Sequence, residues 1–196
     1  MKKKALIVVA HPDDETIWMG GTILHFKNID WTIFSLCRGN DSDRAPKFKK
    51  VCQYYNARGL ISELEDEDIM SVKESVPKIK KIITDKLAGR KFTYIFTHGY
   101  NGEYGHARHL GTHRVVKELV RNKTVTCEKL FFFSYKLNYK GNIINYIKRS
   151  NFATELDDKM FTKKKNIVQN IYGYGKMTPE VSNYCLPKET FALAKL

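Results

Sequence analysis

The sequence lacks the features that would indicate a membrane-spanning, secreted or disulfide-bonded protein. No segment approaches the roughly 18 consecutive apolar residues that a membrane span needs. The apolar run Ala5–Val9 behind Lys2, Lys3 and Lys4 is too short for the hydrophobic region of a signal peptide. The 4 cysteines are far apart and form no C-x-x-C pair, which argues against a zinc knuckle or a dithiol redox motif. We therefore expect a cytoplasmic protein with reduced, mostly buried thiols.

Internal repeats and low-complexity linkers are also missing, and 196 residues are enough for one sizeable core. We predict a single domain over residues 1–196. The 34 basic and 21 acidic residues give a formal net charge of +13, which attracts anions. The lysines are spread along the chain with few arginines or aromatic residues among them, unlike the concentrated charge of nucleic-acid readers. We predict a solvated lysine-rich surface and no specific nucleic-acid partner; peripheral contact with an acidic membrane face stays open.

Apolar and β-branched runs alternate with stretches of helical periodicity along most of the chain. Strands are predicted at Ala5–Val9, Trp31–Leu36, Leu60–Ser62, Phe92–Thr97 and Leu130–Ser134. Helices are predicted after Thr16, from Ala45 to near Gly59, at Val76–Leu87, His106–Arg121 and Asp157–Tyr172, with a last edge strand at Glu189–Leu193. This order predicts an α/β protein with a three-layer Rossmann-like fold, in which a mostly parallel sheet carries helices on both faces.

Two polar clusters follow predicted strands. The first is Ala10–Glu15, which contains His11, Asp13 and Asp14, and the second is Gly105–His113. Four of the chain's 6 histidines fall between His98 and His113, a concentration that packing alone does not explain. Because the carboxyl ends of parallel strands meet at one edge of a sheet, we expect the two clusters to face each other there.

The residue types of the two clusters suit zinc. His11, one of the two aspartates and a histidine of the second cluster form an N/O ligand set that leaves a position for water. The other aspartate can then act as general base, and a second histidine can stabilise an oxyanion. This pattern favours metal-assisted hydrolysis of an acyl bond, although spacing does not say which aspartate is ligand and which is base.

Other polar residues have weaker assignments. His113 is interpreted as a packed residue or an outer contact of the site. His98 either lines the site or bonds to backbone. Glu15 either orients a ligand or favours the positive end of the following helix. An acidic loop is predicted through Glu63–Asp68, with no role assigned.

The two clusters together resemble the PIG-L/LmbE-like zinc-dependent N-acetylglucosaminyl deacetylase family, as do the loop Leu36–Gly39 and the ending Glu189–Phe191. The resemblance implies ligand and catalytic roles by position. It implies zinc ligands at His11, Asp14 and His109, a general base at Asp13, an intermediate-stabilising group at His106 and a substrate contact at Arg44.

Arg108 departs from the family pattern, because many members carry an aspartate there that tunes a neighbouring histidine. We expect Glu103 either to substitute for that aspartate or to contact the substrate. The expected protein is a zinc-dependent amidohydrolase that removes an acetyl group from an N-acetylated amino sugar or glycoconjugate, with Fe²⁺, Mn²⁺ or Co²⁺ as alternative metals. The alternative function is a metal- or sugar-binding module of the same fold without catalysis.

Overall fold

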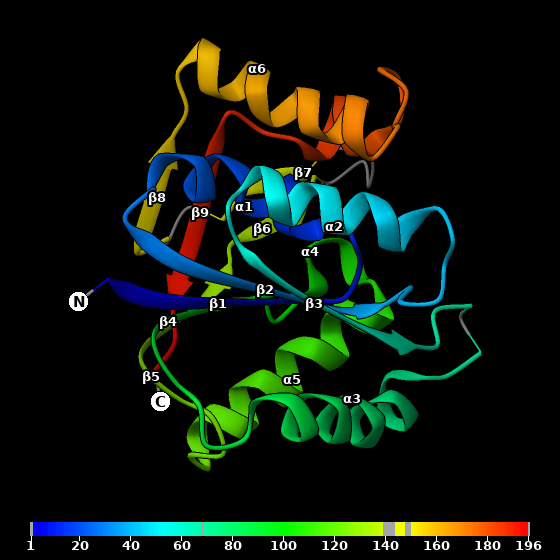
Figure 1. The fold of residues 1–196 in the computed structure, drawn as a ribbon, viewed down its shortest axis with the longest axis vertical. Helices are drawn as coiled ribbons and strands as arrows, with labels where there is room; N and C mark the ends of the chain where they lie inside the picture. The colour runs from blue at the N-terminus through cyan, green and yellow to red at the C-terminus, as the bar shows by residue number, and fades with distance from the viewer. Residues whose placement is uncertain (1, 68, 139–143, 148–149, 196) are drawn as a thin grey trace.

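The computed structural model describes residues 2–67, 69–138, 144–147 and 150–195. Its centre is a seven-stranded sheet of order β3-β2-β1-β4-β5-β9-β8 (Figure 1). The first five strands in this order are parallel, and β9 runs antiparallel to both β5 and β8. The strands are β1 Lys3–Val9, β2 Ile29–Cys37, β3 Arg58–Leu64, β4 Lys91–Thr97, β5 Thr126–Phe133, β8 Phe152–Glu155 and β9 Lys188–Leu193.

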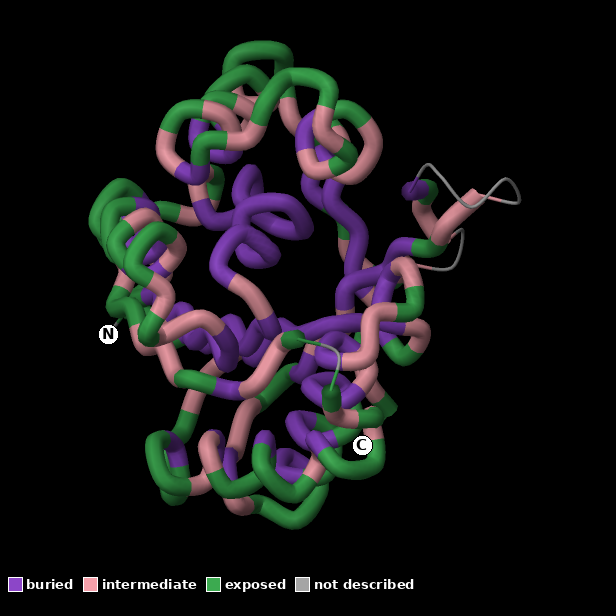
Figure 2. Tube along the Cα trace, turned by 90° about the vertical axis from the view of Figure 1, so that its right-hand side faces the viewer, coloured by how far each residue is buried: buried purple, intermediate pink, exposed green. Residues whose placement is uncertain are grey.

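Helices cover both faces of the sheet. Helices α1 (Asp14–His25), α2 (Arg44–Tyr54) and α6 (Asp158–Asn166) lie on one face, and α3 (Val72–Leu87) and α5 (Ala107–Arg121) lie on the other (Figure 1). Alternate residues of a strand point to opposite faces, so β1 sends Ala5 and Ile7 into the first core and Leu6 into the second. Buried residues accordingly run through the middle of the molecule in Figure 2, and the predicted α/β class is confirmed.

The last third of the chain differs from the prediction. Residues 188–193 form β9, which lies inside the sheet rather than at its edge, because the unpredicted strand β8 pairs with it, Phe152 opposite Phe191. A helix is predicted over residues 157–172. In the structure the α-helical part ends at Asn166, and the chain then forms a π-helical turn at Ile167–Ile171. Shorter elements are α4 (Gly102–Gly105), the hairpin strands β6 (Tyr135–Leu137) and β7 (Ile144–Tyr146), and a second π-helical turn at Glu180–Tyr184.

Several boundaries follow local signals that the periodicity did not reveal. Helix α3 begins four residues before the predicted Val76, because Ser71 and Glu74 form a capping box ahead of it. Within the described residues, no helix is long and apolar enough to cross a membrane. Asp68 of the predicted acidic loop lies outside the described residues.

The strand order places the two polar clusters side by side. Strand β1 has β2 on one side and β4 on the other, so the chain leaves β1 and β4 in different directions at the switch point of the sheet. The backbone N–H of Ala10, after β1, donates to Nε2 of His98, after β4, over 3.0 Å. This hydrogen bond joins the two strand ends on which the site is built.

Candidate metal centre and substrate cavity

Three potential ligand atoms form a compact triangle at the carboxyl end of the sheet. Nδ1 of His11 lies 3.2 Å from Oδ2 of Asp14 and 3.2 Å from Nε2 of His109. The third side, from Nε2 of His109 to Oδ2 of Asp14, is 3.4 Å. Ligands about 2.1 Å from a tetrahedral metal lie about 3.4 Å from one another. The three atoms therefore fit a zinc-sized cation.

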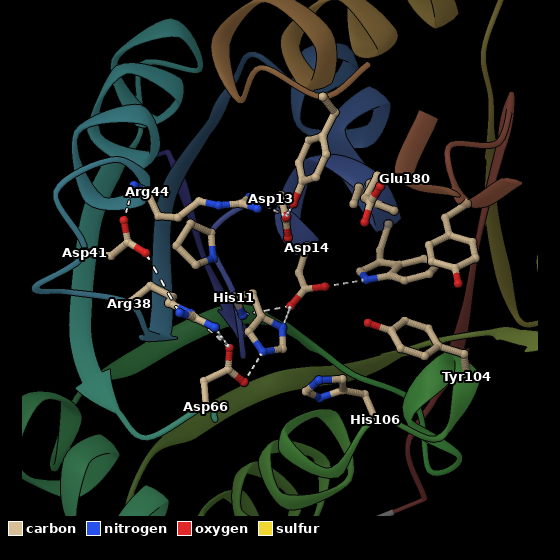
Figure 3. A pocket seen from close by; sticks show the side chains of 15 residues that line it. His11, Asp13, Asp14, Arg38, Asp41, Arg44, Asp66, Tyr104, His106 and Glu180 are labelled. Carbon is tan, nitrogen blue, oxygen red and sulfur yellow. Dashed lines mark hydrogen bonds and ion pairs between the residues drawn. The ribbon is translucent and has the colours of Figure 1, made fainter. Parts of the chain in front are cut away.

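Each of these side chains is held from behind by a second group. Nε2 of His11 bonds Oδ1 of Asp66 over 2.8 Å (Figure 3), and Nδ1 of His109 bonds Oε2 of Glu103 over 2.7 Å. The indole N–H of Trp18 donates to Oδ1 of Asp14 over 2.9 Å. Carboxylates on the far nitrogens fix the histidine tautomers that leave the inward nitrogens free to bind a metal.

Glu103 lies beneath the histidines and not on the cavity wall. It is 1% exposed, and its second carboxylate oxygen accepts from Nδ1 of both His98 and His109, each over 2.7 Å. Burial opposes its ionisation, but the adjacent histidines lower the pKa of Glu103 to about 2. The expected contact of Glu103 with substrate does not fit this position, because the histidines separate the carboxylate from the cavity.

Asp13 faces the cavity beside the triangle. Its Oδ2 is 3.2 Å from Nη1 of Arg44 and accepts a hydrogen bond from the hydroxyl of Tyr174 (Figure 3). Burial and the neighbouring charge of Asp14 raise the pKa of Asp13 to about 7. The backbone of Asp13 has φ +128°, which is strained for a residue with a side chain. Asp13 is thus held as a carboxylate that can exchange a proton near neutral pH.

Glu15 stabilises the strained turn from the protein interior. It is fully buried, and its carboxylate accepts hydrogen bonds from the backbone N–H of Asp13 over 3.1 Å and from the hydroxyl of Tyr172 over 2.8 Å. Burial raises the pKa of Glu15 to about 7. Glu15 therefore lies behind Asp13 and does not join the metal-sized triangle.

His106 lines the cavity at the start of α5. Its Nδ1 accepts the backbone N–H of Arg108 over 3.2 Å as the helix cap, so the neutral ring carries its proton on Nε2. Burial, together with the nearby His109, lowers the pKa of His106 to about 4. His106 is thus a neutral hydrogen-bond donor at the cavity wall.

His98 and His113 serve the protein interior. Nε2 of His98 accepts the Ala10 N–H, and Nδ1 of His113 bonds the carbonyl of His98 over 2.9 Å. Of the two interpretations of His98, the backbone contact fits the structure. His113 is packed, as expected, at 7% exposure.

Arg108 points away from His106 into the acidic loop. It is fully buried and donates to the carbonyl of Glu65 over 2.7 Å, to the Glu65 carboxylate over 2.7 Å and to the carbonyl of Met70 over 3.0 Å. Asp66, which follows Glu65 in this loop, contacts His11. It also forms an ion pair with Arg38, whose Nη2 is 3.0 Å from Oδ2 of Asp66. Arg108 therefore anchors the loop that positions Asp66. It does not take over the expected role of the aspartate at this position, which is to contact a histidine of the site.

The site opens into a polar cavity of about 370 Å³. Trp18, Tyr104 and Tyr184 form an aromatic side, in which the rings of Tyr104 and Tyr184 stack with centroids 5.3 Å apart. The opposite side carries Asp13, Arg38, Asp41, Arg44 and Asp66 (Figure 3). Sequence reasoning missed Asp66, Tyr174 and Tyr184, because they come from a loop and from the last third of the chain, where no motif marks them.

The fold and the site together define an α/β protein with a His/Asp cluster suited to a metal, placed at the switch point of a mostly parallel sheet. The model of the PIG-L family, described as GlcNAc-PI de-N-acetylase, matches residues 6–120, which is more than half of the chain. The chain belongs to this family.

Individual relatives are distant. The chain is 25% identical over 152 residues to the 1D-myo-inositol 2-acetamido-2-deoxy-alpha-D-glucopyranoside deacetylase of Nocardia farcinica, covering 59% of this chain and 51% of that enzyme. It therefore spans about half the length of this relative.

Solved structures share the fold at low identity. The N,N'-diacetylchitobiose deacetylase of Pyrococcus horikoshii superposes with a TM-score of 0.65 at 15% identity, covering 98% of this chain and 84% of that one. The 4-carboxy-2-hydroxymuconate hydratase GalB of Pseudomonas putida superposes equally well, with a TM-score of 0.65 at 13% identity over 99% and 97% of the two chains. Because a hydratase shares the fold, the reaction must be argued from the site.

Proposed function

We propose that the protein is a zinc-dependent amidohydrolase that removes the acetyl group from an N-acetylated amino sugar of the N-acetylglucosamine type, or from a conjugate of such a sugar. The observation that carries this proposal is the triangle of His11, Asp14 and His109, with sides of 3.2, 3.2 and 3.4 Å. These three side chains would hold Zn²⁺. Fe²⁺, Mn²⁺ and Co²⁺ accept similar N/O ligands, so the metal is part of the test.

Zinc at this triangle would supply a Lewis acid for the amide carbonyl and would lower the pKa of water near it. Asp13 accepts the proton of the attacking water, because its carboxylate lines the cavity next to Asp14. The oxygen of that water forms the new bond to the acetyl carbon, and the bond from that carbon to nitrogen breaks. The proton taken by Asp13 balances the proton that the leaving amine gains.

His106 stabilises the tetrahedral intermediate. As a neutral ring with its proton on Nε2, it can donate to the oxygen that becomes negative when water adds to the carbonyl. Arg44 forms an ion pair with Asp13, with Nη1 of Arg44 3.2 Å from Oδ2 of Asp13. Because Arg44 also lines the cavity, its guanidinium group can contact the substrate there. The aromatic side formed by Trp18, Tyr104 and Tyr184 offers apolar faces for a sugar ring.

The sugar class is supported by the relatives' names, since two of them are deacetylases of N-acetylated sugars. The test is acetate release from N-acetylglucosamine, N,N'-diacetylchitobiose and N-acetylglucosaminyl inositol, measured with the protein stripped by chelator and reloaded with each metal. We expect release from at least one of these compounds by the zinc-loaded protein and none after chelation. No release from any of them with any metal would refute the deacetylase proposal.

The alternative proposal is a metal- or sugar-binding module without catalysis. It predicts that the metal-loaded protein binds these sugars in calorimetry while releasing no acetate. The cavity carboxylate Asp13 favours the enzyme, since a binding module does not require a base beside the metal ligands.

A further inference from the structure

A second cavity, of about 710 Å³, opens at the amino ends of the strands, away from the candidate metal centre. It shares no lining residue with the first cavity. Its volume lies within the range of about 300–1,000 Å³ that is usual for small-molecule sites. The sheet contributes Trp31, Tyr94, Phe96 and Phe131, and the walls are Phe26, after α1, and Phe152 of β8.

The lining forms a continuous row of aromatic rings. Centroids of Trp31 and Phe96 are 5.9 Å apart, those of Phe96 and Phe131 5.1 Å, and those of Phe131 and Phe152 6.1 Å. Phe26, Phe131 and Phe152 are only partly buried although each contacts the first core. Concave, mostly apolar cavities with a few polar groups are where small ligands usually bind.

The charged residues that line this cavity are basic. Among the described residues that line the cavity, the charged ones are Lys2, Lys3 and Lys129, and none carries a carboxylate. Glu128, the neighbour of Lys129, lines a different cavity together with Asp30, although its carboxylate also attracts the Lys3 ammonium group.

One of these lysines already lies over the aromatic floor. Nζ of Lys3 donates to the hydroxyl of Tyr94 over 2.9 Å and lies 5.4 Å from the centre of that ring. A carboxylate at the mouth of the cavity would meet this ammonium group, while an alkyl chain attached to it would lie along the rings.

We propose that this cavity binds a single anionic amphiphile of the fatty-acid type, with its alkyl chain against Phe96, Phe131 and Phe152 and its carboxylate between Lys3 and Lys129. Charge complementarity selects this occupant over a neutral or cationic one. The site is independent of the proposed deacetylase activity, because the two cavities lie at opposite ends of the strands.

The first test is calorimetric titration of the intact protein with hexanoate, octanoate and decanoate below their micelle concentrations. We expect saturable binding of one decanoate per chain and a gain in affinity of about three- to fourfold per methylene as the chain lengthens. Decyltrimethylammonium, which has the same alkyl length and the opposite charge, should bind at least tenfold more weakly. No saturable decanoate binding, or equal binding of the cation, would overturn the proposal.

The second test uses charge reversal at exposed positions. The double variant Lys3→Glu with Lys129→Glu should bind decanoate about tenfold more weakly. The matched control is Lys4→Glu with Lys91→Glu, which changes the net charge equally at residues of β1 and β4 that line a different cavity, and this variant should bind like the unmodified protein. An equal loss in both variants would indicate general attraction to a basic protein and would overturn the site.

Sedimentation distinguishes an alternative occupant, a second copy of the chain. If the unmodified protein is a dimer that binds no decanoate, and the Lys3→Glu, Lys129→Glu variant is a monomer, the cavity is a subunit interface and the proposal is wrong. Near-ultraviolet circular dichroism of each variant checks that the fold is kept.

Discussion

Replacing Glu103 with glutamine tests whether the buried carboxylate sets the protonation of the proposed metal ligands. Oε2 of Glu103 accepts from Nδ1 of His98 and His109 at 2.7 Å, and Oε1 accepts the Gly99 N–H at 2.7 Å. Nε2 of His98 already accepts from Ala10, so Nδ1 of His98 has to donate. Glu103 therefore fills three acceptor positions, and the amide of glutamine can fill only those on one side.

Either orientation of the new amide has a cost. With its NH₂ group toward the histidines, the Nδ1 N–H of His98 loses its acceptor. Nδ1 of His109 must then become an acceptor, which moves the proton of the neutral ring to Nε2, the atom that faces Asp14. With its oxygen toward the histidines, the NH₂ group opposes the Gly99 N–H, and a buried unsatisfied donor costs about 1–3 kcal/mol. We expect zinc affinity to fall by about 10- to 100-fold, as for other outer contacts of metal ligands.

The assay is competition for zinc with a chromophoric chelator, combined with urea unfolding of the metal-free protein. The matched control is Glu180→Gln, which makes the same chemical change at a cavity-lining carboxylate outside the metal-sized triangle. Unchanged zinc affinity and stability in Glu103→Gln would refute the view that this carboxylate fixes the tautomer of His109.

Four further outcomes are expected. Asp13→Asn should keep zinc within a few-fold of normal affinity but lower acetate release by about 10²- to 10⁴-fold, because an amide accepts no proton; retained turnover would place the base elsewhere. Arg108→Met should lower the free energy of unfolding by roughly 2–4 kcal/mol in urea titrations, since the carbonyls of Glu65 and Met70 lose their buried donor. Glu189→Ala should cost about 3–5 kcal/mol in the same assay, because the fully buried Lys164 loses the carboxylate 2.8 Å from its Nζ. Zinc at 100 times its Kd should stabilise the protein by about 2.7 kcal/mol and raise Tm by roughly 5–11 °C in calorimetry, reversed by chelator; an unchanged Tm would contradict folding-linked binding.

Most of the sheet could be predicted from sequence because buried parallel strands have a distinctive composition. Runs such as Ala5–Val9 and Phe92–Thr97 consist almost entirely of apolar and β-branched residues. Strand β8 escaped prediction because its four residues, Phe152–Glu155, contain a single large apolar side chain. That omission also placed Glu189–Leu193 at the sheet edge.

The polar clusters that hold the candidate ligands were visible in the sequence. The loop contacts that position these ligands were not. His11 and Asp14 stand in a polar cluster directly after β1, and His109 stands in a second cluster at the start of α5. Topology brings the clusters together, but only the family resemblance selected Asp14 and His109 as the ligands. Asp66 is one of several acidic residues in its loop, and no sequence feature marks it. Its position is fixed by the buried Arg108, which bonds the neighbouring Glu65. Contacts of this kind depend on loop conformation, which hydrophobic periodicity does not encode.

The first helix links the metal site to the end of the chain. Helix α1 is broken at Met19, whose φ of −152° and ψ of 19° are not helical. The carboxylate of Glu189 receives the backbone N–H of Gly21 over 2.8 Å and that of Thr22 over 2.6 Å, so it caps the second half of the helix, and Lys164 balances its charge. A Cβ at Gly21 would collide with the side chain of Leu156, which would then have to move. Asp14, a proposed metal ligand, is the first residue of the same helix. Strand β9 was predicted at the edge of the sheet but lies inside it. This interior position brings the buried Glu189 carboxylate to α1, the helix that presents Asp14.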